Sequence, residues 1–279
     1  MSAAAHSDNH AEAPAPAPAS TASAFAASAG AAEIAAWLPA SRAGLTVHAT
    51  HSDTVNAELA QDIAQRLAAA IAERGFAVLS VSGGKSPIPL FEALRREPLD
   101  WSKVRLTLVD ERCVPGTHPD SNALLVRTHL LQENASAASF FPMVEQAAEA
   151  LPAPAVLAQA ASLALQAAGR TDVLVLGMGA DGHTASLFPD ALNLADALDL
   201  SNPNACMAME LANPPANAPF QRLTQPLAQL LRARHIVLPL SGADKLATLR
   251  LAWQGVNPTY PISCVLHQTE TPVALWISS

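Results

Sequence analysis

The 279-residue chain has few aromatic side chains, only three cysteines and no long apolar run. Aromatic residues make up 4% of the chain, so a core has to be built mainly from the Ala, Leu and Val that dominate its hydrophobic 50%. No stretch of about eighteen residues is both strongly apolar and uncharged, which argues against a membrane span. The cysteines lie far apart without a Cys-x-x-Cys pair, which disfavours a disulfide framework and a zinc knuckle and indicates a reducing, cytoplasmic compartment.

Positive charge is scarce as well. Lysine and arginine total 16 residues against 24 aspartates and glutamates, which gives a net charge of −8. This balance has the wrong sign for general affinity to nucleic acid or to anionic membranes, and neither is expected as a partner. An anionic ligand would have to be held by a local cluster of basic side chains.

The first 43 residues differ in composition from the rest of the chain. They are mostly Ala, Pro and Ser, and they include an Ala-Pro-Ala-Pro-Ala-Pro run at residues 13–18. Such a segment cannot bury enough apolar surface to fold alone. It also lacks the basic start and the Leu-rich centre of a secretion signal. We therefore predict a disordered tail over residues 1–43 and one folded domain over residues 44–279.

From residue 44 onward, short β-branched runs alternate with helical patterns. This order predicts an α/β fold, a doubly wound, mostly parallel sheet with helices on both faces. The clearest helix is predicted from a cap at Ser52 to Gly75, because apolar residues recur there at every fourth position. A surface helix is expected within the Ala-rich stretch 147–168, entered through a Pro turn. Strands are predicted at residues 45–48, 76–81, 104–109, 172–176, 236–240 and 262–266.

Polar loops follow four of the predicted strands, and ligands of parallel sheets bind at the carboxyl ends of strands. The first loop is Ser82-Gly83-Gly84-Lys85-Ser86, in which the glycines let the backbone approach an anion and a serine offers a hydroxyl. It is a candidate phosphate cradle, with a plain strand-to-helix turn as the alternative. It is not a nucleotide P-loop, because Leu79 occupies the position where that motif requires glycine.

The second loop carries Asp110, Glu111 and Arg112, which in isolation could form a surface ion pair. The third loop spans residues 177–184 and contains Asp181 and His183. It matches Gly-x-Gly-x-x-Gly, but Asp181 would face the pyrophosphate of a dinucleotide, which argues against that ligand. Because histidine titrates near neutral pH, His183 beside Asp181 is a candidate general base.

The fourth loop ends at Lys245, in the first turn of a predicted helix. A lysine there opposes the helix dipole, so an anionic partner is a reasonable explanation for it. Arg222 is a further candidate cation. Together, Lys85, Arg112, Arg222 and Lys245 could form the local positive cluster that an acidic protein needs for a phosphate, and the alternative for each is a solvated surface charge.

Taken in order, these motifs resemble those of the 6-phosphogluconolactonase family, within the broader group of sugar-phosphate isomerases and deaminases. The resemblance covers about residues 44–276 and is most specific in the stretch from Gly179 to Pro189, GADGHTASLFP. A glucosamine-6-phosphate deaminase would carry an aromatic residue after the Asp-Glu pair and Ile-Ala-Phe-Asn-Glu after its Gly-His. Arg112 and residues 184–187 instead favour the lactonases.

The resemblance implies hydrolysis of a sugar-phosphate lactone, 6-phospho-D-glucono-1,5-lactone, to 6-phosphogluconate in the oxidative pentose phosphate pathway. It implies that His183 takes a proton from water and that Asp181 orients the base or the substrate. Arg112 or loop N–H groups are expected to stabilise the negative charge that develops on the carbonyl oxygen. No metal or cofactor is expected. A deaminase or isomerase and a non-catalytic sugar-phosphate sensor are the alternatives. The residues expected to bind the substrate and its phosphate are Ser82, Gly83, Gly84, Lys85, Ser86, Asp110, Arg222 and Lys245.

Overall fold

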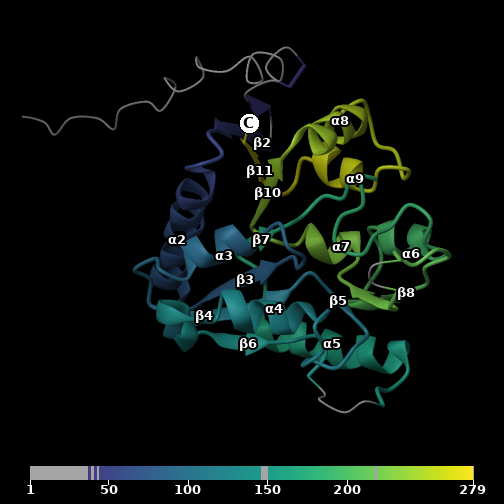
Figure 1. Ribbon diagram of the computed structural model, residues 1–279, viewed down its shortest axis with the longest axis horizontal. Helices are drawn as coiled ribbons and strands as arrows, with labels where there is room; N and C mark the ends of the chain where they lie inside the picture. The colour runs from purple at the N-terminus through teal and green to yellow at the C-terminus, as the bar shows by residue number, and fades with distance from the viewer. Residues whose placement is uncertain (1–36, 39–40, 43, 146–149, 217–218, 279) are drawn as a thin grey trace, which may run out of the picture.

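The computed structural model describes residues 37–38, 41–42, 44–145, 150–216 and 219–278. Its centre is an eight-stranded sheet with the order β1-β2-β11-β10-β7-β3-β4-β6 (Figure 1). Neighbouring strands are parallel throughout, except that β1 is antiparallel to β2. The strands are β1 Ser41–Arg42, β2 Leu45–Thr50, β3 Ala77–Val81, β4 Val104–Leu108, β6 Ser139–Phe141, β7 Val173–Val175, β10 His235–Ser241 and β11 Val273–Ser278.

Helices cover both faces of this sheet, and the predicted doubly wound fold is confirmed. The sheet separates two apolar clusters, and β11 shows the division because its residues alternate between them: Ala274 belongs to the first cluster and Val273 and Leu275 to the second. The first cluster includes residues of four helices, α2 Val55–Arg74, α3 Ile88–Leu94, α4 Asn122–His129 and α5 Pro154–Ala168. The second cluster includes residues of α6 Leu194–Leu198, α7 Leu227–Leu230, α8 Ala243–Ala252 and α9 Ile262–His267. None of the described helices is long and apolar enough to cross a membrane.

A small antiparallel sheet, which the sequence did not reveal, lies beside the main one. Its order is β5-β9-β8, with bounds β5 Asp110–Arg112, β8 Met207–Met209 and β9 Arg222–Thr224. Strand β5 follows β4 almost directly in the chain, so the second polar loop of the sequence is held as a paired strand. Two short 3-10 helices complete the described secondary structure, at Trp101–Lys103 and Glu133–Ala137.

Helix α2 forms where the apolar repeat predicts it. The apolar side chains at every fourth position from Val55 to Leu67 are buried against the sheet, and Gly75 ends the helix with a left-handed φ of 83°. The cap differs from the prediction. Thr54, not Ser52, precedes the helix, and its side chain makes no capping hydrogen bond.

The predicted strand at residues 262–266 is wrong, because these residues form helix α9. A short apolar run fits a buried strand and a buried helix equally well, and Pro261 supplies a backbone conformation that suits a helix start. The sheet position is taken instead by β11, where no strand was predicted. The Ala-rich helix α5 begins at Pro154 and, rather than lying wholly on the surface, buries Leu157 and Leu165.

The packed domain includes residues that precede Gly44. The side chain of Leu38 is 2% exposed within the second apolar cluster, and Trp37 packs against that cluster. Strand β1 pairs with β2 through Ser41 and Arg42. The remainder of the predicted tail, residues 1–36, 39–40 and 43, lies outside the described residues.

Candidate active site

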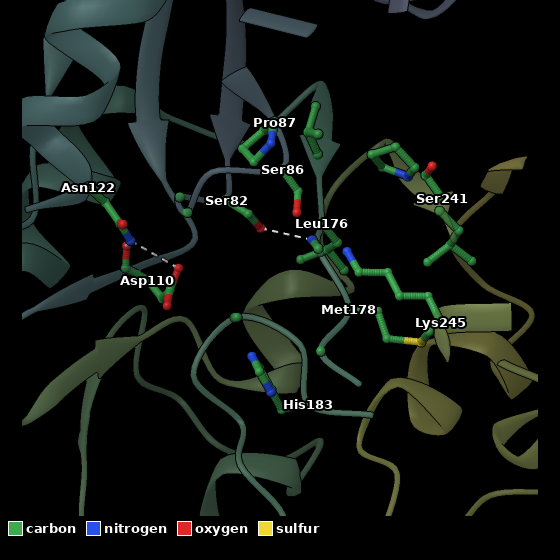
Figure 2. Close-up of a pocket in the computed structure, with 18 of the residues that line it drawn as sticks. Ser82, Ser86, Pro87, Asp110, Asn122, Leu176, Met178, His183, Ser241 and Lys245 are labelled. Carbon is green, nitrogen blue, oxygen red and sulfur yellow. Dashed lines mark hydrogen bonds between the residues drawn. The ribbon is translucent and has the colours of Figure 1, made fainter. Parts of the chain in front are cut away.

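A cavity of about 730 Å³ opens at the carboxyl ends of the parallel strands (Figure 2). All four polar loops of the sequence contribute to its wall. Of the predicted site residues, Lys85 and Asp181 do not line the cavity, although Gly84 and Ser86 on either side of Lys85 do, and so does His183, which pairs with Asp181. Those that line it are Ser82, Gly83, Gly84, Ser86, Asp110, Arg112, His183, Arg222 and Lys245.

The strand order explains how these loops meet. Strands β10, β7, β3 and β4 are consecutive neighbours in the sheet. Lys245 follows β10, His183 follows β7, Ser82 follows β3 and Asp110 follows β4. The candidate base therefore lies between a lysine on one side and the aspartate–arginine loop on the other, as the ring of His183 does in Figure 2.

The glycine loop fits tightly against its neighbours. A Cβ atom on Gly83 would lie 1.9 Å from Asn122 Oδ1, so no larger residue fits there without moving that side chain. Gly84 has a φ of 84°, in the region that favours glycine. The hydroxyl oxygen of Ser82 accepts a hydrogen bond from the N–H of Gly177 at 3.0 Å, which joins the glycine loop to the loop that carries His183.

Glu111 organises the second loop from inside the protein. Its side chain is fully buried and accepts hydrogen bonds from the N–H groups of Arg112, Asn122 and Ala123 at 2.7, 2.8 and 2.8 Å. Burial raises the pKa of Glu111 to about 7 despite these donors. Glu111 thus ties β5 to the start of α4, where Ser121 caps the helix by accepting a hydrogen bond from the N–H of Leu124.

Asp110 and Arg112 reach the cavity from the same short strand. The hydroxyl of Ser186 donates to Asp110 Oδ2 at 2.7 Å, so a residue just beyond His183 holds this carboxylate. Arg112 Nη1 donates to Asn122 Oδ1 at 2.8 Å and to the carbonyl oxygen of Asp120 at 2.7 Å. These bonds fix both side chains before any substrate binds.

Arg222 lies beside Arg112, on the neighbouring strand β9. It is 3% exposed and donates to the carbonyl oxygen of Phe220 at 2.7 Å. Burial, followed by the charge of Arg112, lowers the pKa of its guanidinium. The cavity wall therefore holds two adjacent positive charges, one of them deeply buried.

His183 and Asp181 form a close pair. His183 Nδ1 lies 2.5 Å from Asp181 Oδ1, and the same oxygen accepts a hydrogen bond from the His183 backbone N–H at 3.1 Å. Burial raises the pKa of Asp181, but the hydrogen bond and charge of His183 outweigh it, so that the pKa is lowered overall. A carboxylate on Nδ1 leaves Nε2 as the ring nitrogen that can accept a proton.

The imidazole of His183 is also fixed by packing. It stacks on Phe188 with ring centroids 4.3 Å apart. A Cβ atom on Gly179 would lie 2.2 Å from the ring, so this position needs glycine. The sequence motif therefore combines the candidate base, the carboxylate that orients its ring and the residues that leave room for it.

Lys245 extends from α8 across the cavity, and its ammonium group points toward Ser86 (Figure 2). Burial lowers the pKa of Lys245. No ion pair joins Lys245 to another described residue. A half-buried cation of this kind is suited to an anionic group brought by a ligand.

Sequence reasoning missed part of the cavity wall. Ser52 precedes α2 and Asn56 lies in its first turn, and Trp276 and Ser278 belong to the unpredicted strand β11. No motif marked these residues as part of a site. Within the described chain, no group of three or more His, Cys, Asp or Glu side chains is arranged to hold a metal ion.

Comparisons with known proteins agree on one family. The family model described as glucosamine-6-phosphate isomerases/6-phosphogluconolactonase matches residues 50–276. A 6-phosphogluconolactonase of Pseudomonas putida is 48% identical over 215 residues, 77% of this chain and 86% of that protein. One from Pseudomonas aeruginosa is 46% identical over 70% of this chain and 79% of its own length. The crystal structure of a 6-phosphogluconolactonase from Shewanella baltica has a TM-score of 0.77 at 37% identity, over 84% of this chain and 97% of that one.

Proposed function

Because the chain belongs to the glucosamine-6-phosphate isomerase/6-phosphogluconolactonase family, we propose that it hydrolyses 6-phospho-D-glucono-1,5-lactone to 6-phospho-D-gluconate. It is a lactone-hydrolysing enzyme of the oxidative pentose phosphate pathway, as the sequence motifs imply. The observation that carries the proposal is the pairing of His183 Nδ1 with Asp181 Oδ1 at 2.5 Å. The cavity that His183 lines is also lined by three cationic side chains, Arg112, Arg222 and Lys245. The cytoplasm is the proposed compartment, and the three cysteines are free thiols.

The reaction needs one proton to be moved twice. His183 Nε2 takes a proton from water as the water oxygen bonds to the lactone carbonyl carbon. The resulting tetrahedral intermediate then loses the bond from that carbon to the ring oxygen. The imidazolium returns its proton to the departing ring oxygen, so the base is restored. Asp181 stabilises the imidazolium between these two steps.

The cations divide between the two ends of the substrate. We assign the phosphate to Lys245, Arg222 and the loop of residues 82–86, whose backbone can approach an anion closely. Arg112 is assigned to the charge that develops on the carbonyl oxygen. A carboxylate repels phosphate, so Asp110 is assigned to a sugar hydroxyl, for which it is an acceptor.

Turnover of freshly generated lactone, corrected for spontaneous hydrolysis, tests this function. The purified protein should release 6-phosphogluconate well above the uncatalysed rate. Glucosamine 6-phosphate should give neither ammonia nor fructose 6-phosphate. Turnover of the amino sugar without lactonase activity would assign the protein to the deaminase branch of the family, and activity on neither compound would favour a sensor.

A further inference from the structure

Helix α8 touches the active site at two places. Lys245 and Thr248 are three residues apart, so they lie on the same side of the helix. Lys245 lines the cavity. The Thr248 hydroxyl lies 2.7 Å from the carbonyl oxygen of Ala180 and 3.2 Å from that of Asp244 in its own helix. Since a hydroxyl has one proton, the shorter bond to Ala180 is the stronger one.

Ala180 belongs to the turn that presents the base. It directly precedes Asp181, whose carboxylate holds His183. On its other side this turn is held by the start of α9, where the N–H of Ile262 donates to the carbonyl oxygen of Gly182 at 3.0 Å. A Cβ atom on Gly182 would lie 2.8 Å from Tyr260, so the turn is closely enclosed. The turn is therefore fixed between two helices, and Thr248 is the side chain that bonds it to α8.

We propose that Thr248 is a positioning residue that links the phosphate-binding helix to the catalytic turn. Thr248 is 6% exposed and does not line the cavity, so it acts through Ala180 rather than on the substrate. Its hydroxyl sets where the Ala180 carbonyl lies, and thereby the direction of the Asp181 carboxylate onto the imidazole. The inference rests on the proposed lactonase function and adds to it a specific residue.

The arrangement has a consequence for how binding energy is used. When the substrate phosphate engages Lys245, it fixes α8, and the Thr248 bond passes this restraint to the turn of residues 179–183. Binding energy from a part of the substrate that does not react would then improve the alignment of the base. Loss of the hydroxyl should therefore lower kcat and leave the affinity for the phosphate end unchanged.

Three variants test the role of the hydroxyl. Thr248→Val keeps the shape and removes the donor, whereas Thr248→Ser keeps the donor. Thr271→Val is the matched control, because Thr271 is 3% exposed and donates to the carbonyl oxygen of Leu231 away from the cavity. We expect Thr248→Val to lower kcat by about 10-fold to 100-fold, because small misplacements of reacting groups have effects of this size. The KM for the lactone and the inhibition constant of 6-phosphogluconate should stay within about twofold of their wild-type values. Thr248→Ser and Thr271→Val should keep wild-type kcat.

The thermal midpoints separate positioning from general destabilisation. Both valine variants lose one buried hydroxyl bond, so similar decreases in Tm are expected, with a fall in kcat for Thr248→Val alone. A wild-type kcat in folded Thr248→Val overturns the inference while leaving the lactonase function in place. If Thr248→Val does not fold, Thr248→Ala replaces it in the same comparison, and an unchanged kcat there overturns the inference equally. Absence of lactonase activity in the wild-type protein would instead overturn the function itself.

Discussion

Arg112 and Arg222 are directly opposite each other on the antiparallel strands β5 and β9. Like charges at such a position destabilise a sheet. Arg112 donates a hydrogen bond to the carbonyl oxygen of Asp120, and Arg222 donates one to that of Phe220. Both arginines also line the cavity. A protein with a net charge of −8 thus concentrates positive charge at the proposed binding site of an anionic substrate.

Phosphate ions should therefore stabilise the wild-type protein. An anion at the cavity offsets the repulsion within the arginine pair, and a ligand present at about 100 times its dissociation constant contributes about 2.7 kcal/mol to the free energy of unfolding. Thermal unfolding in sodium phosphate, with sodium chloride at equal ionic strength as control, measures the gain. Arg222→Met, which removes a cation assigned to the phosphate, should show a smaller gain. An equal increase of Tm in both salts would mean that screening, not binding, is responsible.

Replacing His183 with Ala should lower kcat by about 10²-fold to 10⁴-fold, the usual contribution of a general base. His129→Ala is a close control, because His129 is also 30% exposed and has its Nδ1 near a carboxylate, Glu92, at 3.3 Å. Steady-state kinetics of both variants should show the loss only at His183. Near-normal turnover of His183→Ala would assign the base to another residue.

Lys245→Ala should chiefly raise KM. Most of the binding energy of a contact to phosphate is realised equally in the ground state and in the transition state, so its loss should raise KM by a larger factor than it lowers kcat. The smaller fall in kcat reflects the alignment of the base that α8 supports. Lys103→Ala provides the control, since Lys103 is half exposed and pairs with Asp100 outside the cavity. Unchanged KM for Lys245→Ala, measured over a range of lactone concentrations, would remove Lys245 from the phosphate site.

Glu111 should make the stability of the protein depend on pH. Burial raises its native pKa to about 7, above the ordinary value of 4.5. The native carboxyl then holds a proton that the unfolded chain has lost, so its contribution to the free energy of unfolding falls as pH rises from about 4.5 to about 7.

The glutamine of Glu111→Gln does not titrate, so the free energy of unfolding of this variant lacks the fall with pH that Glu111 causes. The amount by which the wild-type protein is more stable than Glu111→Gln should therefore shrink over the same pH range. Urea unfolding at several pH values measures this difference, and Glu73→Gln, at a side chain that is 70% exposed, serves as the control. A difference that grows with pH would contradict a raised pKa of Glu111 in the native protein.

Two truncations should separate the N-terminal segment into parts. Removal of residues 1–36 should leave Tm and kcat nearly unchanged, because the composition of this segment predicts no docking on the domain. Removal of residues 1–43 also deletes Leu38, which is 2% exposed, and strand β1, so it should lower Tm. Equal midpoints for the two truncations would show that Leu38 adds nothing to the core.

The sequence alone determined the fold class and most of the cavity wall. Helix α2 was predictable because its apolar repeat is a local pattern that matches the helical period. The loops at residues 82–86, 110–112 and 177–184 were predictable as one site because parallel strands deliver their carboxyl ends to the same edge of a sheet. His183 and Asp181 could be paired in advance because they are only two residues apart.

Only the tertiary structure decided which distant residues meet. Arg222 faces Arg112 and Ser186 holds Asp110 because β9 and the turn after His183 are brought to β5 by pairings between segments far apart in the chain. The same long-range pairing placed β11 in the sheet and left residues 262–266 to form a helix. A short apolar run satisfies either state locally, and the choice depends on which segment completes the hydrogen bonds of the neighbouring strand.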